Sequence, residues 1–204
     1  MGWGNQADSR HERWFIEQFV DAGYEVHAIE LPTNGTDLER DYLGPVRDYR
    51  ADLPSHTVIC HSMGGLVTAH LRPDTPVVYL SPFWGLEFPS VLTPLLWLPV
   101  SRPFLPSGVA PGPLGELATA EDATAPKSVS PKWLRTMTKA QATLPDLKES
   151  DVVFYSPTDV VVDTTAIVEH ADSEQLHQYD GGHELFSSAG RDEYVDRVLA
   201  ALER

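Results

Sequence analysis

Cysteine is almost absent from this sequence of 204 residues. The single cysteine, Cys60, excludes an internal disulfide framework and a zinc site built from cysteines. Long apolar runs are also missing, because none reaches the roughly 18 residues that a membrane-spanning helix needs. The first residues, Met1 to Gln6, have neither the basic nor the apolar region of a signal peptide. We therefore expect a cytoplasmic protein without stable membrane insertion.

Basic residues are scarce. Fifteen Lys and Arg stand against thirty Asp and Glu, which gives a formal net charge of -15. This balance disfavours nucleic-acid binding, which needs basic side chains to replace the counterions around phosphate. Arginine outnumbers lysine, and every lysine lies between Lys127 and Lys148. Two explanations of the acidic excess stay open. One is ordinary solubility, and the other is adaptation to a salt-rich cytoplasm, where screening weakens the repulsion among carboxylates.

Apolar residues are plentiful, at 42% of the chain, so a sizeable core is expected. Apolar runs bounded by turn residues predict strands, and helical spacing predicts helices between them. The predicted strands are 24–31, 57–60, 76–80, 151–155 and 174–179. The predicted helices are 9–22, 37–50 (with Thr36 as its N-cap), a helix that ends near 71, 164–170 and 189–202. This alternation predicts an α/β protein with a doubly wound, mostly parallel sheet.

Residues 82–150 interrupt the alternation. They contain eleven of the seventeen prolines and three of the five tryptophans. Proline occurs too often there for a long regular helix, although 132–143 can form one, entered through Ser130-Pro131. We interpret 82–150 as a cap or lid inserted into a core made of 1–81 and 151–204. A poorly ordered linker is the alternative, which the aromatic content disfavours.

The five residues His61-Ser-Met-Gly-Gly65 follow a predicted strand and open a helix. A serine on such a turn projects from the carboxyl edge of the sheet, beside the backbone N–H groups of the helix start. Small residues on either side of the serine allow strand and helix to pass closely. Gly64 meets this need, and Cys60 stands where a first glycine is usual. Ser62 is therefore the predicted nucleophile.

An acid and a histidine should follow Ser62, each after a strand. Asp159 follows 151–155 in SPTDVVVD, and His183 follows 174–179 in DGGHELF. With the GWG opening, GYEVHAIELP and CHSMGG, nearly the whole chain resembles the α/β-hydrolase superfamily, specifically its esterase and lipase-like members. Asp163, four residues beyond Asp159, is the alternative acid, although its position before Thr164 suits a helix cap.

The resemblance implies acyl transfer with a small-molecule ester as substrate and no cofactor. Ser62 would attack the ester, His183 would take its proton, and Asp159 would orient the imidazole. The oxyanion would be held by the backbone N–H groups of Met63 and Trp3. Aromatic side chains of the cap suggest an apolar acyl pocket, with their own packing as the alternative. These residues are Trp84, Phe88, Trp97 and Phe104.

The resemblance also exposes an anomaly. In the resembling fold, a strand that leads into the oxyanion loop lies between the strands at 24–31 and 57–60, and this sequence begins after it. An unpaired buried backbone group costs about 1–3 kcal/mol. We therefore expect that Met1 is not the natural start and that a short apolar strand is encoded upstream.

Several alternatives stay open. Thioesterase, amidase and carbon–carbon hydrolase activities use the same framework, and a non-catalytic binding protein of this fold is a different class of function. Contact of the cap with lipid is disfavoured by the acidic balance. No metal-ligand spacing is present among the eight histidines. His61 is expected to pack beside the site, and Asp180 and Glu184 are expected to be solvated. The sequence leaves the oligomeric state open.

Overall fold

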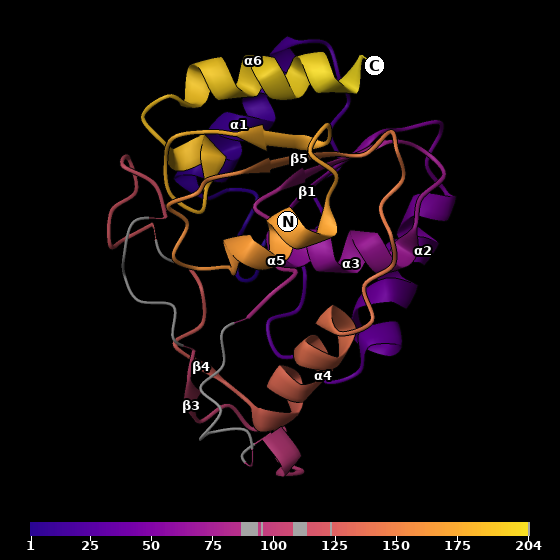
Figure 1. Ribbon diagram of the computed structural model, residues 1–204, viewed down its shortest axis with the longest axis vertical. Helices are drawn as coiled ribbons and strands as arrows, with labels where there is room; N and C mark the ends of the chain where they lie inside the picture. Colours follow the sequence, from indigo (N-terminus) through magenta and orange to yellow (C-terminus); the bar gives the residue numbers. More distant parts are fainter. Residues whose placement is uncertain (87–93, 95, 108–113, 123, 204) are drawn as a thin grey trace.

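A parallel β-sheet forms the centre of the computed structural model (Figure 1), which describes residues 1–86, 94, 96–107, 114–122 and 124–203. The strands lie in the order β1-β2-β5-β6, and every neighbouring pair is parallel. Their bounds are Val58–His61, Val77–Leu80, Val152–Tyr155 and Leu176–Gln178. Because parallel strands share their direction, the loops after β1, β5 and β6 emerge at the same edge of the sheet.

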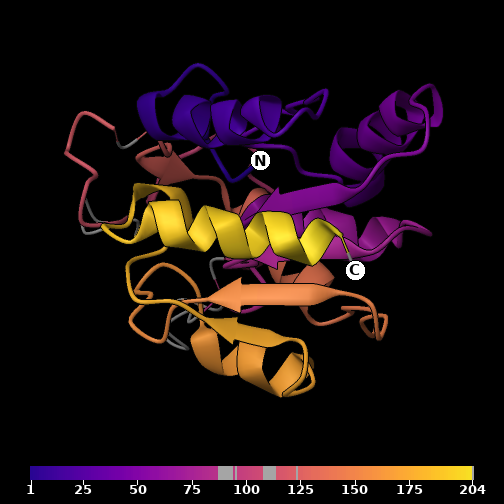
Figure 2. The ribbon, with the colours of Figure 1, turned by 90° about the horizontal axis from the view of Figure 1, so that it is seen from above.

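Helices cover both faces of this sheet. In Figure 1, α1 (Arg10–Asp21) and α6 (Arg191–Leu202) lie above it, and α3 (Met63–Leu71) and α5 (Thr164–His170) lie below it. Figure 2, a view from above, shows α6 (yellow) lying over the strands. The segment before β1 holds a π-helical turn, η1 (Glu39–Leu43), which continues into α2 (Gly44–Ala51). The predicted doubly wound α/β architecture is confirmed.

The strands bury both of their faces, as continuous apolar runs in a covered parallel sheet do. Successive residues alternate between two clusters, because neighbouring side chains of a strand point to opposite faces. Val77 and Tyr79 pack in the cluster that contains Leu66 of α3, whereas Val78 and Leu80 join the cluster of α1 and α6. Leu66 and Val77 are completely buried. The sheet thus supplies a rigid base for the loops at its carboxyl edge.

Residues 82–150 connect β2 to β5. Their described parts include a short antiparallel pair, β3 (Leu105–Pro106) with β4 (Ser128–Val129), and the helix α4 (Pro131–Gln141). The Ser130 hydroxyl accepts a hydrogen bond from the Trp133 N–H, so the predicted entry through Ser130-Pro131 is confirmed. The apolar side of α4 belongs to the same buried cluster as α3, and the indole of Trp133 donates to the Tyr42 hydroxyl.

Most of the predicted elements are confirmed to within two or three residues. The N-cap at Thr36 was wrong: the Asp37 carboxylate accepts the hydrogen bond from the Arg40 N–H, and no side-chain bond from Thr36 caps the helix. Asp37 caps the helix instead of Thr36, because its carboxylate reaches a free N–H group of the first turn.

The predicted strand at 24–31 was wrong as well. The segment has no regular secondary structure and pairs with none of the strands that the structure describes, and its Ile29 carbonyl accepts a hydrogen bond from the Met1 amine at 3.0 Å. An apolar, β-branched pattern favours extended backbone, but a strand also needs a partner for its N–H and C=O groups.

Candidate active site

Ser62 occupies a strained turn between β1 and α3. Its φ of 51° and ψ of -119° lie in a region that residues with a side chain rarely adopt. Three backbone hydrogen bonds hold it there. The Ser62 N–H donates to Leu80 O at 3.0 Å, and Ser62 O accepts from Gly65 N at 2.8 Å and Phe83 N at 2.9 Å. The turn places the serine at the carboxyl edge of the sheet.

The glycines after Ser62 are required by close packing. A Cβ on Gly64 would lie 2.7 Å from the Met1 carbonyl oxygen, and one on Gly65 would lie 2.6 Å from the Pro82 Cβ. Cys60 fits because it is small: it is buried in β1, and its Sγ lies 3.6 Å from the Val78 carbonyl oxygen. The turn at Ser62 is therefore packed closely against the amino-terminal residue Met1 as well as against Pro82, the residue that lies two positions after β2.

His183 and Asp159 form a buried pair. His183 Nδ1 lies 2.8 Å from Asp159 Oδ2, and both side chains are almost completely buried. The other carboxylate oxygen of Asp159, Oδ1, accepts hydrogen bonds from Val161 N at 2.8 Å and Val162 N at 3.2 Å. Asp159 is thus fixed by its own loop while it contacts the imidazole. This contact orients the imidazole ring.

Asp163 has a different role from Asp159. Its Oδ1 accepts hydrogen bonds from Thr165 N at 2.9 Å and Ala166 N at 3.3 Å, at the start of α5. It is therefore an N-cap, as its position before Thr164 indicated. The structure describes no contact of Asp163 with His183.

Within the described residues, no hydrogen bond joins the Ser62 hydroxyl to His183. Both residues are buried, with exposed fractions of 7% and 4%. Hydrogen bonds between catalytic groups often tighten only when substrate binds. The ring of His61 lies against that of His183, at 4.8 Å between centroids, and packs on Phe186.

His61 is a neutral neighbour of His183. Burial first, and then the charge of His183, hold the pKa of His61 well below its usual range. Its Nε2 lies 3.4 Å from the His183 carbonyl oxygen, which accepts, and within the described part of the chain its Nδ1 has no partner. An uncharged His61 places no positive charge beside an imidazolium at His183.

The two predicted oxyanion donors lie in well-defined places. Met63 opens α3, where the first N–H groups have no partner within the helix. The Trp3 ring stacks on Trp133 at 4.9 Å, and its indole donates to Thr33 O at 2.6 Å. Among the described contacts, neither the backbone N–H of Met63 nor the backbone N–H of Trp3 donates to another group.

A buried acid pair next to His183 was not predicted. Asn5 Nδ2 donates to Glu12 Oε1 and, at 3.1 Å, to Glu184 Oε1. Burial and the nearby Glu184 charge raise the pKa of Glu12 to about 7, and burial raises the pKa of Glu184. The expectation that Glu184 is solvated was therefore wrong, because its exposed fraction is only 6%.

The aromatic residues predicted for an acyl pocket lie in different surroundings. Trp84 is buried against Tyr79 and His170, at 5.0 and 5.1 Å between ring centroids. Trp97 and Phe104 are 74% and 50% exposed. Phe88 lies outside the described residues. An acyl pocket built from these four side chains stays a prediction.

Metal and membrane features were searched in the described part of the chain. There, no three His, Cys, Asp or Glu side chains gather in a way that would hold a metal ion. None of the described helices has the length and apolar character needed to cross a bilayer.

Comparison with known proteins finds one matching family model and a number of solved structures with a similar fold. The model of the "Alpha/beta hydrolase family" matches residues 2–197. A monoacylglycerol lipase from Paleococcus ferrophilus superposes with a TM-score of 0.76 at 20% identity, covering 98% of this chain and 91% of that one. A structure described under LipS and LipT, two metagenome-derived lipolytic enzymes, gives 0.69 at 20% identity, covering 95% and 87%. An extracellular hydrolase from a Paenibacillus species gives 0.64 at 16% identity, covering 98% and 95%. No curated protein matches the sequence.

Proposed function

Since the chain belongs to the alpha/beta hydrolase family, we propose that it cleaves carboxylic esters by acyl transfer to Ser62, with His183 as general base and Asp159 as its orienting acid. The observation that carries the proposal is the 2.8 Å contact between His183 and Asp159, at the sheet edge where Ser62 occupies its strained turn. The similar folds described as a monoacylglycerol lipase and as lipolytic enzymes support ester substrates.

In the first step, the Ser62 oxygen attacks the ester carbonyl carbon while His183 Nε2 accepts the hydroxyl proton. Asp159 stabilises the resulting imidazolium through Nδ1, and neutral His61 adds no charge beside it. The carbonyl oxygen becomes an oxyanion, which the N–H groups of Met63 and Trp3 stabilise. Loss of one such donor costs about 3 kcal/mol in the transition state.

Collapse of the tetrahedral intermediate breaks the bond to the alcohol, which leaves with the proton from His183. In the second step, water loses a proton to His183 and attacks the acyl group on Ser62. The carboxylic acid then departs and Ser62 recovers its proton. Each step uses the same oxyanion donors, so their placement affects both rates. The apolar cap, 82–150, with Trp84, Phe88, Trp97 and Phe104, is the proposed source of the acyl-binding surface.

A kinetic comparison of ester, thioester and anilide substrates tests this function. We expect hydrolysis of short-chain nitrophenyl esters to exceed that of the matching acyl-thioesters and anilides in kcat/KM. Ser62→Ala should remove ester hydrolysis, whereas Ser55→Ala, a change of an exposed serine before β1, should leave it unchanged. Faster turnover of the thioester would reassign the substrate class, and hydrolysis that survives Ser62→Ala would overturn the mechanism.

We also propose that the chain works in a salt-rich cytoplasm. The support is its net charge of -15. Salt screens repulsion among exposed carboxylates, so molar sodium chloride should raise the free energy of unfolding by on the order of 1 kcal/mol relative to dilute buffer. Equal unfolding free energies in the two buffers would contradict this part of the proposal.

A further inference from the structure

Trp3 lies in a tight turn. The Asn5 N–H donates to Gly2 O at 3.4 Å, which closes a β-turn with Trp3 and Gly4 at its centre. The φ of Gly4 is 82°, which suits the third residue of a type II turn. The backbone N–H of the second residue, here Trp3, has no partner within such a turn. It can therefore donate outside the turn, in a direction that depends on the contacts that hold the turn in place.

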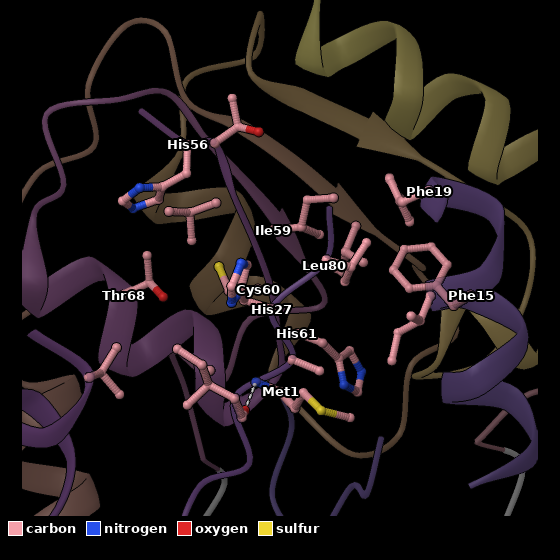
Figure 3. A pocket seen from close by; sticks show the side chains of 18 of the residues that line it. Met1, Phe15, Phe19, His27, His56, Ile59, Cys60, His61, Thr68 and Leu80 are labelled. Carbon is pink, nitrogen blue, oxygen red and sulfur yellow. Dashed lines mark hydrogen bonds between the residues drawn. The ribbon is translucent and has the colours of Figure 1, made fainter. Parts of the chain in front are cut away.

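On one side the turn borders a cavity of about 250 Å³. Met1, Gly2 and Asn5 are among the residues that line this cavity. Figure 3 shows Met1 and His61 among the side chains around it. A void gives the atoms that line it no partner on one side, so they lose contacts there. The packing on this side of the turn is therefore incomplete.

The cap supplies the close contacts of the two central residues of the turn. The Trp3 ring stacks on the Trp133 ring of α4, with 4.9 Å between centroids and 27° between planes. A Cβ on Gly4 would lie 2.9 Å from Ala125 Cα and 3.0 Å from Thr124 O, so the backbone of the cap passes directly against the turn. The position of Trp3 thus follows the position of the cap.

Trp133 is itself held by hydrogen bonds. Its ring is buried, and its indole N–H donates to the Tyr42 hydroxyl at 3.1 Å. That hydroxyl donates in turn to Gly35 O at 3.3 Å. Because Tyr42 is completely buried in η1, it gives the indole a rigid partner. The ring that stacks on Trp3 is therefore fixed in both position and orientation.

The segment before η1 connects the turn and the cap a second time. The Trp3 indole N–H donates to Thr33 O at 2.6 Å. The next residue, Asn34, donates through Nδ2 to Ser101 O at 2.9 Å and accepts from the Ser130 hydroxyl at 2.9 Å. Both partners of Asn34 belong to the cap, so Trp3, this segment and the start of α4 form one hydrogen-bonded unit.

We propose that Trp133 is a positioning residue for the Trp3 N–H, so that the cap controls the oxyanion hole. This inference rests on the ester hydrolysis proposed above, in which the Trp3 N–H is one of the two donors. The donor acts on the charge that develops in the transition state. A shift of α4 that turns this N–H away therefore lowers kcat more than it changes KM.

Two substitutions of Trp133 separate the contribution of its ring from that of its hydrogen bond. Trp133→Phe keeps an aromatic ring against Trp3 but loses the donor to Tyr42, whereas Trp133→Leu loses both. With a short-chain nitrophenyl ester, we expect Trp133→Leu to lower kcat by about 100-fold and to change KM by less than about threefold. Trp133→Phe should retain kcat to within about tenfold, because it loses one hydrogen bond.

Exchange of the Trp3 indole proton with water gives a readout that needs no substrate. In protein with ¹⁵N-labelled tryptophan, Trp3→Phe identifies the indole signal of Trp3. We expect Trp133→Leu to speed this exchange by about tenfold, because the bond to Thr33 O opens more often.

Val198→Ala is the control for a general loss of stability, because Val198 is completely buried in α6, in the other core cluster. It should lower the melting temperature but leave kcat and the indole exchange unchanged.

Several results would overturn the proposal. Wild-type kcat and wild-type exchange in Trp133→Leu remove the positioning role. A change confined to KM makes Trp133 part of the substrate-binding surface, and an equal loss of kcat in Val198→Ala assigns the effect to stability. Absence of ester hydrolysis in the wild type would remove the proposed function, whereas unchanged indole exchange in Trp133→Leu would remove this inference alone.

Discussion

The carboxyl-terminal and amino-terminal parts of the candidate active site are held in place by different means. Asp159 and His183 follow β5 and β6, strands that are paired with their neighbours. Trp3, by contrast, follows no strand in the described chain, and its loop is held by the stack on Trp133 and the indole bond to Thr33. The His183–Asp159 pair thus follows paired strands, whereas the position of Trp3, the proposed oxyanion donor, depends on side-chain contacts.

Asn5 connects the two parts. It binds Glu12 of α1 and Glu184, the residue after His183. Because both carboxyls are buried beside the same amide, the pair favours one negative charge over two. The amino-terminal part is therefore expected to respond to pH and to small steric changes, and the carboxyl-terminal part mainly to changes in the pair itself.

The largest effect is expected when the carboxyl-terminal pair is changed. In Asp159→Asn the amide oxygen can still accept from Val161 and Val162, but the amide N–H₂ faces His183 Nδ1 and favours the wrong tautomer. We expect kcat for ester hydrolysis to fall by about 10⁴-fold. Asp163→Asn is the matched control, since it changes an N-cap: it should lower the free energy of unfolding by about 1 kcal/mol or less and preserve kcat. The reverse pattern would make Asp163 the acid.

The second effect concerns pH and the link between the two parts. The Glu12 pKa of about 7 lies above its usual 4.5, so the folded state binds more protons between these values and stability falls as pH rises from 4.5 to 7. The difference corresponds to about 3 kcal/mol. Glu12→Gln should remove this loss, so the variant and wild type should be similar at pH 4.5 and the variant more stable at pH 8.

Denaturant unfolding at the two pH values measures this difference. Glu17→Gln, an exposed change on the same helix, is the control and should follow the wild type at both pH values. A Glu12→Gln variant that loses as much stability as the wild type between pH 4.5 and pH 8 would show that Glu12 is ionised at no cost.

The smallest of the three effects is expected from a steric change at the amino terminus. A Cβ on Gly2 would collide with Asn5 Oδ1 and lie 2.6 Å from His61 Nδ1. Gly2→Ala should therefore displace the Trp3 N–H and lower kcat by about 100-fold, with a smaller change in KM. Gly23→Ala is the control: its φ of 94° makes the change strained, but no atom lies within 4 Å, so kcat should be unchanged. Equal kcat for Gly2→Ala and wild type would remove Trp3 as a donor.

The sequence predicted the parts of the molecule that depend on local signals. The turn at Ser62, the strands before Asp159 and His183, and the cap at Asp163 each have a short pattern with a direct structural cause. Residues 24–31 carry a strand pattern too, yet whether they form a strand depends on a partner that local sequence does not contain. The contact of Asn5 with Glu184 joins residues 179 positions apart. The local sequence around Glu184 contains no pattern that distinguishes a buried glutamate from an exposed one.

Labelling with a fluorophosphonate probe tests the central claim most directly, because the probe reacts only with an activated serine and releases fluoride as the serine oxygen bonds to phosphorus. Digestion and mass spectrometry should locate one adduct on the peptide that contains Ser62. Ser62→Ala should abolish the adduct, and Asp159→Asn should slow its formation severely. Folded wild-type protein that gains no adduct, or an adduct that persists in Ser62→Ala, would contradict the account and favour a binding protein of this fold.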